Sequence, residues 1–491
     1  MTPPRPWRWP TPAQRRATRL ICCCSDPRND SFAPNLSHSG SAGRFLIADV
    51  RLGRSCRRQL AASGGKRFGG FWFEGPGKQT NGSVASVVRS ASLALVMRFL
   101  FALASTGALG GCAVTREAAP DEGVILSKPF EIVSMDSLSP MLAYKFESLS
   151  KIDPARPIAG DMAGQTLSLF GREDLIAASS SDYRSSGCAP LTPAPDVFNE
   201  IVRRARLTSI VIVNESHERS RHRGFITELA SRLRPLGYDT LAMEALSNPP
   251  AGTLERYLPA ILAQPDLPFL EDEDGFYVSE AAFGRLGRQA KALGYRLLPY
   301  EFNEEGGLPA DASRNDRIAV REEGQARSLA SFLREHRGVK LVIHVGYSHA
   351  AEVLRPDGAK WMAARLKGKT DIDPLTISQT SCRGGGETMR LSALPSNEVA
   401  GTFDLLVDHP IARFTRGRPE WRKHAGDRPV GIPHALRPTA GWRVIEARPL
   451  GEPVTSVPMD RVAIRPGEDI VLMLPPGRFH LRAIDVRRAD Q

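Results

Sequence analysis

Short apolar runs that alternate with longer helical stretches constrain the fold of this chain more than any other feature of its sequence. The runs lie at 209–213, 240–243, 296–299, 340–345 and 375–378, and the helical stretches at 222–235, 279–293, 313–337 and 359–367. Buried strands that alternate with helices are typical of βαβ units. The sequence therefore predicts an α/β fold, in which a mostly parallel sheet is flanked by helices.

After residue 407 this pattern changes. Pro and Arg become frequent, and strand-like runs at 442–447, 461–464, 470–474 and 480–484 follow one another without helices between them. We therefore expect an α/β domain over 129–410 and a small β-rich domain over 411–491. The overall composition, 42% hydrophobic and 24% charged, excludes a collagen-like, fully disordered or multi-span membrane protein.

The net charge of +11 is confined to the first fifth of the chain. Of the 65 Lys and Arg residues 15 lie within 1–96, against 4 of the 54 Asp and Glu residues, so the rest of the chain is neutral. Arg, Pro, Gly and Ser dominate this segment, which shows little periodicity. We interpret 1–96 as a disordered or untranslated basic extension, and we expect no nucleic-acid partner.

Residues 97–111 have the pattern of a secretory signal peptide. One positive residue follows Met97, and the apolar run after it is shorter than the roughly 20 residues that span a bilayer. The run ends in Leu-Gly-Gly-Cys at Cys112, which resembles the bacterial lipoprotein cleavage box. The resemblance implies a lipid anchor on Cys112, and Ala113 after it implies an outer-membrane lipoprotein that faces the periplasm. Residues 112–128 are then expected to form a tether.

Two cysteines remain after Cys112. Cys188 and Cys382 are an even pair, and in an oxidising periplasm such a pair predicts a disulfide. Two separate thiols are the alternative, since their distance does not follow from the sequence.

Polar residues follow four of the predicted strands directly. Glu215 and His217 come after the first, Glu244 after the second, Glu301 after the third and His349 after the fourth. In an open parallel sheet the carboxyl ends of the strands share one edge, where ligands bind. Carboxylates and imidazoles at such an edge share protons, orient a water molecule or hold a metal ion. We therefore expect a functional site there.

These residues also carry a family resemblance. The segments Asn214-Glu215-Ser216-His217-Glu218, His222-Arg223, Ala242-Met243-Glu244 and 345–352 (Val-Gly-Tyr-Ser-His-Ala-Ala-Glu) resemble the erythromycin-esterase/ChaN-like superfamily, and more distantly TraB/Tiki proteins. The resemblance covers about 205–410. It departs from the family at Asn214, where Gly is usual, which affects the turn beside Glu215.

The resemblance implies that Glu215, His217, Glu244 and His349 form the active centre of a hydrolase, with a His as general base on water. Other relatives bind haem or depend on a divalent metal, which here would be held by Glu215, His217 and His349. A lipid-anchored haem or metal carrier is therefore the second hypothesis. The substrate and the oligomeric state do not follow from the sequence.

Other polar residues at this edge are candidates for substrate binding. Arg223 and Arg321 are positioned to clamp an anionic group, and Glu301 and Tyr347 complete this set. His344 lies within a predicted strand and is expected to be a core histidine.

A serine hydrolase is the third hypothesis. Gly346-Tyr347-Ser348-His349-Ala350 follows a strand and is similar to a nucleophile elbow, with Ser348 as nucleophile. Asp404 or Asp408 with His409 or His434 would complete a triad. This reading leaves Glu215, His217 and Glu244 unexplained.

Overall fold

The computed structural model describes residues 123–153, 161–302, 308–309, 311–356 and 358–486. All of these belong to one compact unit of the chain. The predicted basic extension 1–96, the signal peptide 97–111 and Cys112 lie outside the described residues. Within the described part of the chain, no helix is long and apolar enough to cross a membrane.

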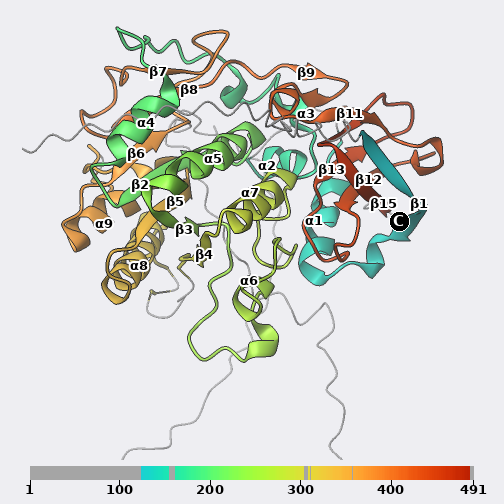
Figure 1. Cartoon of the computed structure of the whole chain (residues 1–491), viewed down its shortest axis with the longest axis horizontal. Helices are drawn as coiled ribbons and strands as arrows, with labels where there is room; N and C mark the ends of the chain where they lie inside the picture. The colour runs from blue at the N-terminus through green and yellow to red at the C-terminus, as the bar shows by residue number, and fades with distance from the viewer. Residues whose placement is uncertain (1–122, 154–160, 303–307, 310, 357, 487–491) are drawn as a thin grey trace, which may run out of the picture. The chain divides into compact units, whose positions relative to one another are not determined.

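The larger sheet has seven strands in the order β4-β3-β5-β2-β6-β8-β7 (Figure 1). All neighbours pair in parallel except β7, which is antiparallel to β8. The strands are β2 Ile210–Glu215, β3 Tyr238–Met243, β4 Arg296–Pro299, β5 Lys340–Gly346, β6 Leu375–Ser378, β7 Arg390–Ser392 and β8 Leu405–Asp408. The predicted mostly parallel sheet with helices is confirmed.

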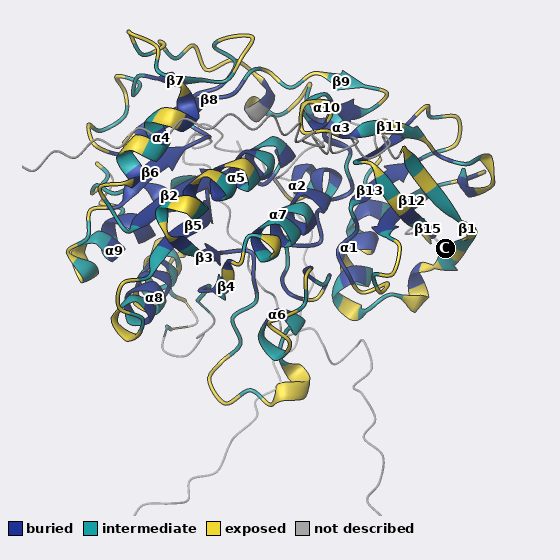
Figure 2. Ribbon diagram, in the orientation of Figure 1, coloured by how far each residue is buried: buried dark blue, intermediate teal, exposed yellow. Residues whose placement is uncertain are grey.

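Helices cover both faces of this sheet, because successive strand residues point to opposite sides. Val211 and Val213 pack with α4, α5 and α7, whereas Ile210 and Ile212 pack with α8 and α9. The strands are accordingly buried between the helices (Figure 2). The helices are α4 Val197–Ala205, α5 Ser220–Leu233, α7 Ala281–Ala292, α8 Arg314–Glu335 and α9 Met362–Thr370.

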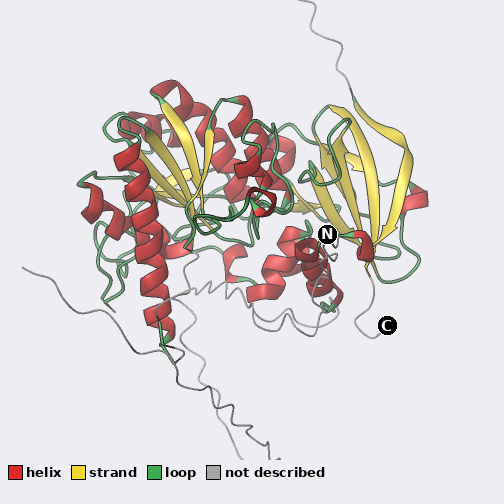
Figure 3. Cartoon of the chain, turned by 90° about the horizontal axis from the view of Figure 1, so that it is seen from below, coloured by secondary structure: helices red, strands yellow, loops and turns green. Residues whose placement is uncertain are grey.

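The second sheet has the order β1-β15-β12-β13, and it is separate from the first (Figure 3). Its strands are β1 Val124–Ser134, β12 Trp442–Pro449, β13 Asp460–Ile464 and β15 Gly477–Val486. Two short pairs accompany it: β9 Phe414–Thr415 with β10 Arg418–Pro419, and β11 Arg428–Gly431 with β14 Val471–Leu474. The predicted C-terminal β-rich region is therefore present.

The N-terminal part of the described chain belongs with this C-terminal sheet. β1 pairs in parallel with β15, so residues 124–128, which we expected in the tether, are the first half of a strand. The physical reason is burial: Phe146, Leu149 and Phe170 pack with strand residues of β12 and β15 in one cluster. The first helices, α1 Pro140–Ser150 and α2 Asp161–Leu169, thus lie on the second sheet and not on the first.

Short helices complete the described elements. They are α3 Glu173–Ile176, α6 Ala260–Ala263, α10 Trp421–His424 and the 3-10 turns η2 Met135–Ser137, η3 Ser181–Tyr183, η4 Arg234–Leu236, η5 Glu255–Tyr257, η6 Tyr347–Ala350 and η7 His434–Leu436. A capping box of Ser313 and Asp316 starts α8, as the Ser/Asp-rich start predicts.

Cys188 and Cys382 form a disulfide in this structure, with Cα atoms 5.7 Å apart. The bond joins residues 194 positions apart in the sequence. It fixes the loop before α4 to the segment that follows β6, where the backbone of Ser186 also donates to the carbonyl of Arg383 at 2.9 Å. Closing long loops of this kind typically stabilises a fold by about 2–4 kcal/mol.

Candidate functional site

The four strands whose ends carry the predicted site are neighbours in the sheet, in the order β4-β3-β5-β2. Glu215 is the last residue of β2, Glu244 follows β3 directly, Glu301 lies two residues after β4, and His349 lies in η6 after β5. Parallel strands end at the same edge, so the structure brings these residues and His217 together.

Glu215 is a buried carboxylate whose two oxygens are both bonded. Arg223 of α5 donates to them through Nε at 2.8 Å and Nη2 at 2.9 Å. Nε2 of His344 lies 3.1 Å from Oε2. Burial alone would raise the pKa of Glu215, but the charges of Arg223 and His344 hold that pKa well below its ordinary value. Glu215 is therefore a fixed negative charge.

His217 is oriented by three contacts. Its Nδ1 lies 2.9 Å from Oε1 of Glu215, and its ring stacks on Tyr277 with centroids 4.5 Å apart and planes at 14°. The ring of Tyr347 meets it edge-on, 5.1 Å between centroids. Because an ionised carboxylate only accepts, Nδ1 of His217 carries a proton.

Glu244 lies between the two site histidines. Its Oε2 accepts from the backbone N–H of Gly346 at 2.6 Å, and its Oε1 accepts from Nη2 of Arg321. Oε1 is also 3.7 Å from Nε2 of His349. Burial acts to raise the pKa of Glu244, but Arg321, His349 and His217 outweigh it and lower the pKa to about 2. Glu244 is thus ionised at neutral pH.

His349 forms a second carboxylate–imidazole pair. Its Nδ1 lies 2.6 Å from Oε1 of Glu322, whose Oε2 accepts from the backbone of Met362 at 2.7 Å. Burial alone would lower the pKa of His349, but the charges of Glu322 and Glu244 raise it. Trp361 meets the ring edge-on, with centroids 5.3 Å apart. The imidazole therefore holds its proton more strongly than an isolated histidine.

The two predicted arginines are already paired with carboxylates. Arg223 lies between Glu215 and Glu280, with Nη1 3.3 Å from the latter. Arg321 binds Glu244 and Glu301, and its Nε is 2.9 Å from Oε1 of Glu301. Their charges are therefore compensated by carboxylates within the protein, and a role for them in binding an anionic substrate group stays a prediction.

The turn after β5 lacks the geometry of a nucleophile elbow. In an elbow the nucleophile itself occupies the strained position, but here the residue with positive φ is Tyr347, at 32°, and not Ser348. The proposed triad histidine His409 has Nε2 2.8 Å from Gln379 and Nδ1 3.5 Å from Arg221. The contacts of His409 thus serve packing around β8.

Sequence reasoning missed two residues of the site, Glu322 and Tyr277. His344 is buried in β5 as expected, and its partner there is Glu215. Neither of the two missed residues follows a strand. Glu322 did leave a signal, because helical spacing places it on the buried face of α8 with Ala326 and Leu329. A carboxylate on an apolar face needs a partner. Tyr277 left no comparable signal.

A metal site does not form from the predicted residues as they are placed. Among the described residues, no group of three or more His, Cys, Asp or Glu side chains is arranged to hold a metal ion. Both oxygens of Glu215 face Arg223, His217 and His344, so this carboxylate is engaged within the protein.

No family model matches this chain, and no curated protein matches it. Several solved structures are similar to part of it. The type III effector HopBA1 matches with 14% identity over 46% of this chain and 98% of that chain, at a TM-score of 0.30. RRSP, a MARTX toxin effector domain from Vibrio vulnificus CMCP6, matches with 15% identity over 50% of this chain and 47% of that chain, at a TM-score of 0.30.

ChaN of Campylobacter jejuni, solved with cofacially bound haem, matches with 10% identity over 44% of this chain and 94% of that chain, at a TM-score of 0.29. These likenesses cover at most half of the chain, and this chain spans about half of RRSP. The function is therefore argued from the geometry of the site alone.

Gly346 provides a test of this geometry. Its φ of −79° suits any residue, but a Cβ there would lie 2.9 Å from Nε2 of His217 and 3.2 Å from Oε2 of Glu244. We expect Gly346→Ala to displace the His217 ring and to lower the free energy of unfolding by about 1–3 kcal/mol. Urea unfolding and the NMR signal of the His217 ring measure both effects.

Gly431→Ala is the matched control, since a Cβ at Gly431 meets nothing within 4 Å. It is expected to change neither quantity. If Gly346→Ala behaves like this control, His217 does not lie against Gly346 and the described site is wrong.

Proposed function

We propose that this protein is a hydrolase, in which His217 is the general base on a water molecule that attacks an ester, lactone or amide carbonyl. One observation carries the proposal: two imidazoles approach the two oxygens of Glu244, and each has its Nδ1 against a buried carboxylate of its own. A carboxylate that orients an imidazole is the arrangement by which enzymes hold a base or an acid ready.

His217 is suited to be the base. Glu215 fixes a proton on Nδ1, and Nε2 faces the side of Gly346 where Oε2 of Glu244 also lies. In the form that acts as the base, Nε2 is unprotonated. A water molecule between them would donate one hydrogen bond to Nε2 of His217 and the other to Oε2 of Glu244. As the water oxygen bonds to the carbonyl carbon, Nε2 takes its proton.

His349 is suited to be the acid. Glu322 and Glu244 raise its pKa, and Arg321 lies beside it, with Nη1 3.3 Å from Nε2. When the bond between the carbonyl carbon and the leaving group breaks, His349 supplies the proton that the leaving group needs. The guanidinium of Arg321 stabilises the negative charge that develops on the carbonyl oxygen. His349 recovers a proton as His217 releases one.

Substitutions separate this mechanism from the alternatives. With a panel of nitrophenyl esters, lactones and anilides and the full chain, we expect His217→Gln to lower kcat by about 10²–10⁴-fold. Glu244→Gln is expected to have a similar effect, and Ser348→Ala a change of a few-fold at most. Loss of activity in Ser348→Ala but not in His217→Gln would support the serine hydrolase instead. Stoichiometric bound haem without turnover would support the haem carrier.

The pH dependence tests the acid. Turnover that needs protonated His349 falls as the pH rises through the pKa of His349, which lies above its ordinary value. Glu322→Gln removes the carboxylate that raises this pKa, and its amide oxygen can still accept from the backbone of Met362. We therefore expect the alkaline limb of the pH–rate profile to move to lower pH in Glu322→Gln. An unmoved limb would exclude His349 as the acid.

We also propose that the protein is an outer-membrane lipoprotein that faces the periplasm and is anchored through Cys112. The signal-peptide pattern of 97–111 supports this, as does the disulfide between Cys188 and Cys382, because disulfides persist in oxidising compartments. We expect mass spectrometry of the native protein to find a lipid on Cys112 as the first residue. A chain that begins before Met97 without lipid would contradict the proposal.

A further inference from the structure

The ring of Tyr277 lies flat against the ring of His217. Glu215 holds one nitrogen of that imidazole, and Tyr347 meets its edge. The stacked ring of Tyr277 adds a restraint on the plane of the imidazole, because rotation of that plane would break the parallel contact. The direction of Nε2 therefore depends in part on where Tyr277 is held.

Tyr277 belongs to residues 271–280, an irregular segment between α6 and α7 that is attached to the chain before β13. The backbone of Val457 donates to Leu270 at 2.8 Å, and that of Asp272 donates to Thr455 at 2.9 Å. Between these two bonds, Glu271 and Ser456 form an isolated antiparallel bridge. The start of the segment is thus fixed to the C-terminal β-rich region.

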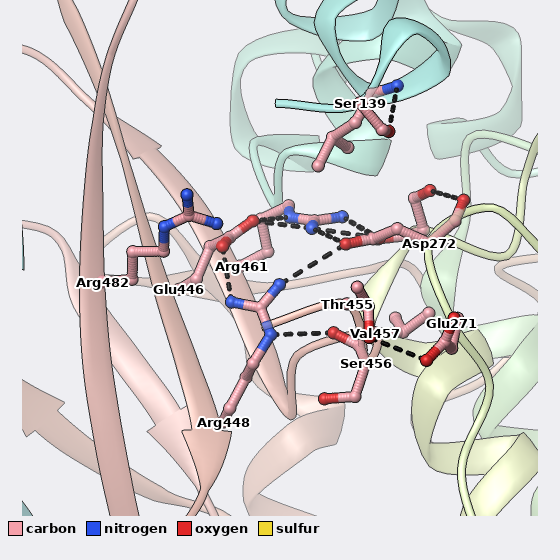
Figure 4. Close-up of polar contacts among 12 residues, drawn as sticks. Ser139, Glu271, Asp272, Glu446, Arg448, Thr455, Ser456, Val457, Arg461 and Arg482 are labelled. Carbon is pink, nitrogen blue, oxygen red and sulfur yellow. Dashed lines mark hydrogen bonds and ion pairs between the residues drawn. The ribbon is translucent and has the colours of Figure 1, made fainter. Parts of the chain in front are cut away.

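Arg461 of β13 bonds to both ends of this segment (Figure 4). Its Nη2 lies 2.8 Å from Oδ2 of Asp272, and its Nη1 donates both to Asp272 and to the backbone carbonyl of Ser279. Asp272 and Ser279 lie on either side of Tyr277 in the sequence. One guanidinium therefore holds together the two ends of the segment that carries the ring.

The charges around Arg461 are balanced and buried. Arg448 of β12 donates to Asp272 at 3.4 Å and to Glu446 at 2.6 Å, and Glu446 also accepts from Arg461 at 2.7 Å (Figure 4). Each of these four side chains is at most 5% exposed. From the other side, Lys145 of α1 donates to the hydroxyl of Ser279 at 2.5 Å. Because these groups are buried, water competes little for the bonds that hold the two ends of the segment.

We propose that Asp272 is a positioning residue for the site: its pairing with Arg461 and Arg448 holds Tyr277 against His217. The C-terminal sheet then helps to set the orientation of the His217 imidazole. The effect on turnover rests on the proposed hydrolase function, but the effect on the position of the ring does not.

NMR of the full chain tests this directly. The Cε1 proton of His217 is shifted by the ring current of Tyr277, and the signal is assigned by its loss in His217→Gln. We expect Tyr277→Leu to move this signal towards the value of an unstacked histidine, and Asp272→Asn to move it in the same direction. Amides of 273–279 should exchange faster with deuterium in Asp272→Asn. Where turnover is measurable, kcat should fall by about 10–100-fold with KM little changed.

Asp460→Asn is the matched control. Asp460 lies beside Arg461 in β13 and is equally buried, but its partners Arg418 and Arg422 do not contact the 271–280 segment in the bonds described above. It is expected to lower stability without moving the His217 signal.

Arg461→Lys is the second variant, for use if Asp272→Asn does not fold. It keeps the charge, but an ammonium cannot span Asp272 and Ser279 as the guanidinium does. An unmoved His217 signal in a folded Asp272→Asn or Arg461→Lys protein overturns the inference. A moved signal in a protein without hydrolase activity supports the inference and removes only the proposed function.

Discussion

The buried pair of Glu215 and Arg223 is the interaction on which the site depends. Glu215 ends a central strand, where neighbouring strands and helices exclude water, and an unpaired carboxylate there would be strongly destabilising. Breaking such a pair typically costs about 3–5 kcal/mol. Arg223, in the first turns of α5, donates to both carboxylate oxygens, so the start of this helix is tied to the end of β2. The same carboxylate then orients His217, which joins the stability of the fold to the direction of the imidazole.

The same edge of the sheet carries a second pair in which a buried carboxylate orients an imidazole. Glu322 holds His349 as Glu215 holds His217, while Arg321 neutralises Glu244 and Glu301 together. Both Arg223 and Arg321 are thus paired with carboxylates of the protein. An arginine paired in this way remains a source of positive potential. In the proposed reaction Arg321 stabilises developing negative charge without moving, and its role there is electrostatic.

The sequence predicts those site residues that directly follow a strand. It misses residues such as Tyr277 that reach the site from elsewhere in the chain. Glu215, Glu244, Glu301 and His349 follow buried strands, so the parallel sheet alone brings them together. Tyr277 is brought to His217 by contacts between residues 270–272 and 455–461, which are far apart in the chain and show no complementary pattern. The pairing of β1 with β15 was missed for the same reason. From the sequence alone, residues 124–128 are expected in the tether, because their partners in β15 lie more than 350 positions away in the sequence.

Asn214 of β2 joins two strand ends at the site. Its side chain is buried and must therefore be bonded. Its Nδ2 donates to the carbonyl of Tyr347 at 2.7 Å, and its Oδ1 accepts from the backbone of Gln379 at 2.7 Å. The first of these bonds holds Tyr347 in its positive-φ conformation, which a non-glycine residue keeps only when its surroundings impose it.

The ring of Tyr347 in turn meets His217 edge-on, and its hydroxyl lies 3.2 Å from that of Ser216. The amide of Asn214 links the end of β2 to the strained residue after β5, so the edge-on contact of His217 depends on how these two strands pair. The stacked contact depends on Tyr277, which lies outside both strands. The direction of the imidazole is thus set by the assembled fold as well as by the short motif that contains it.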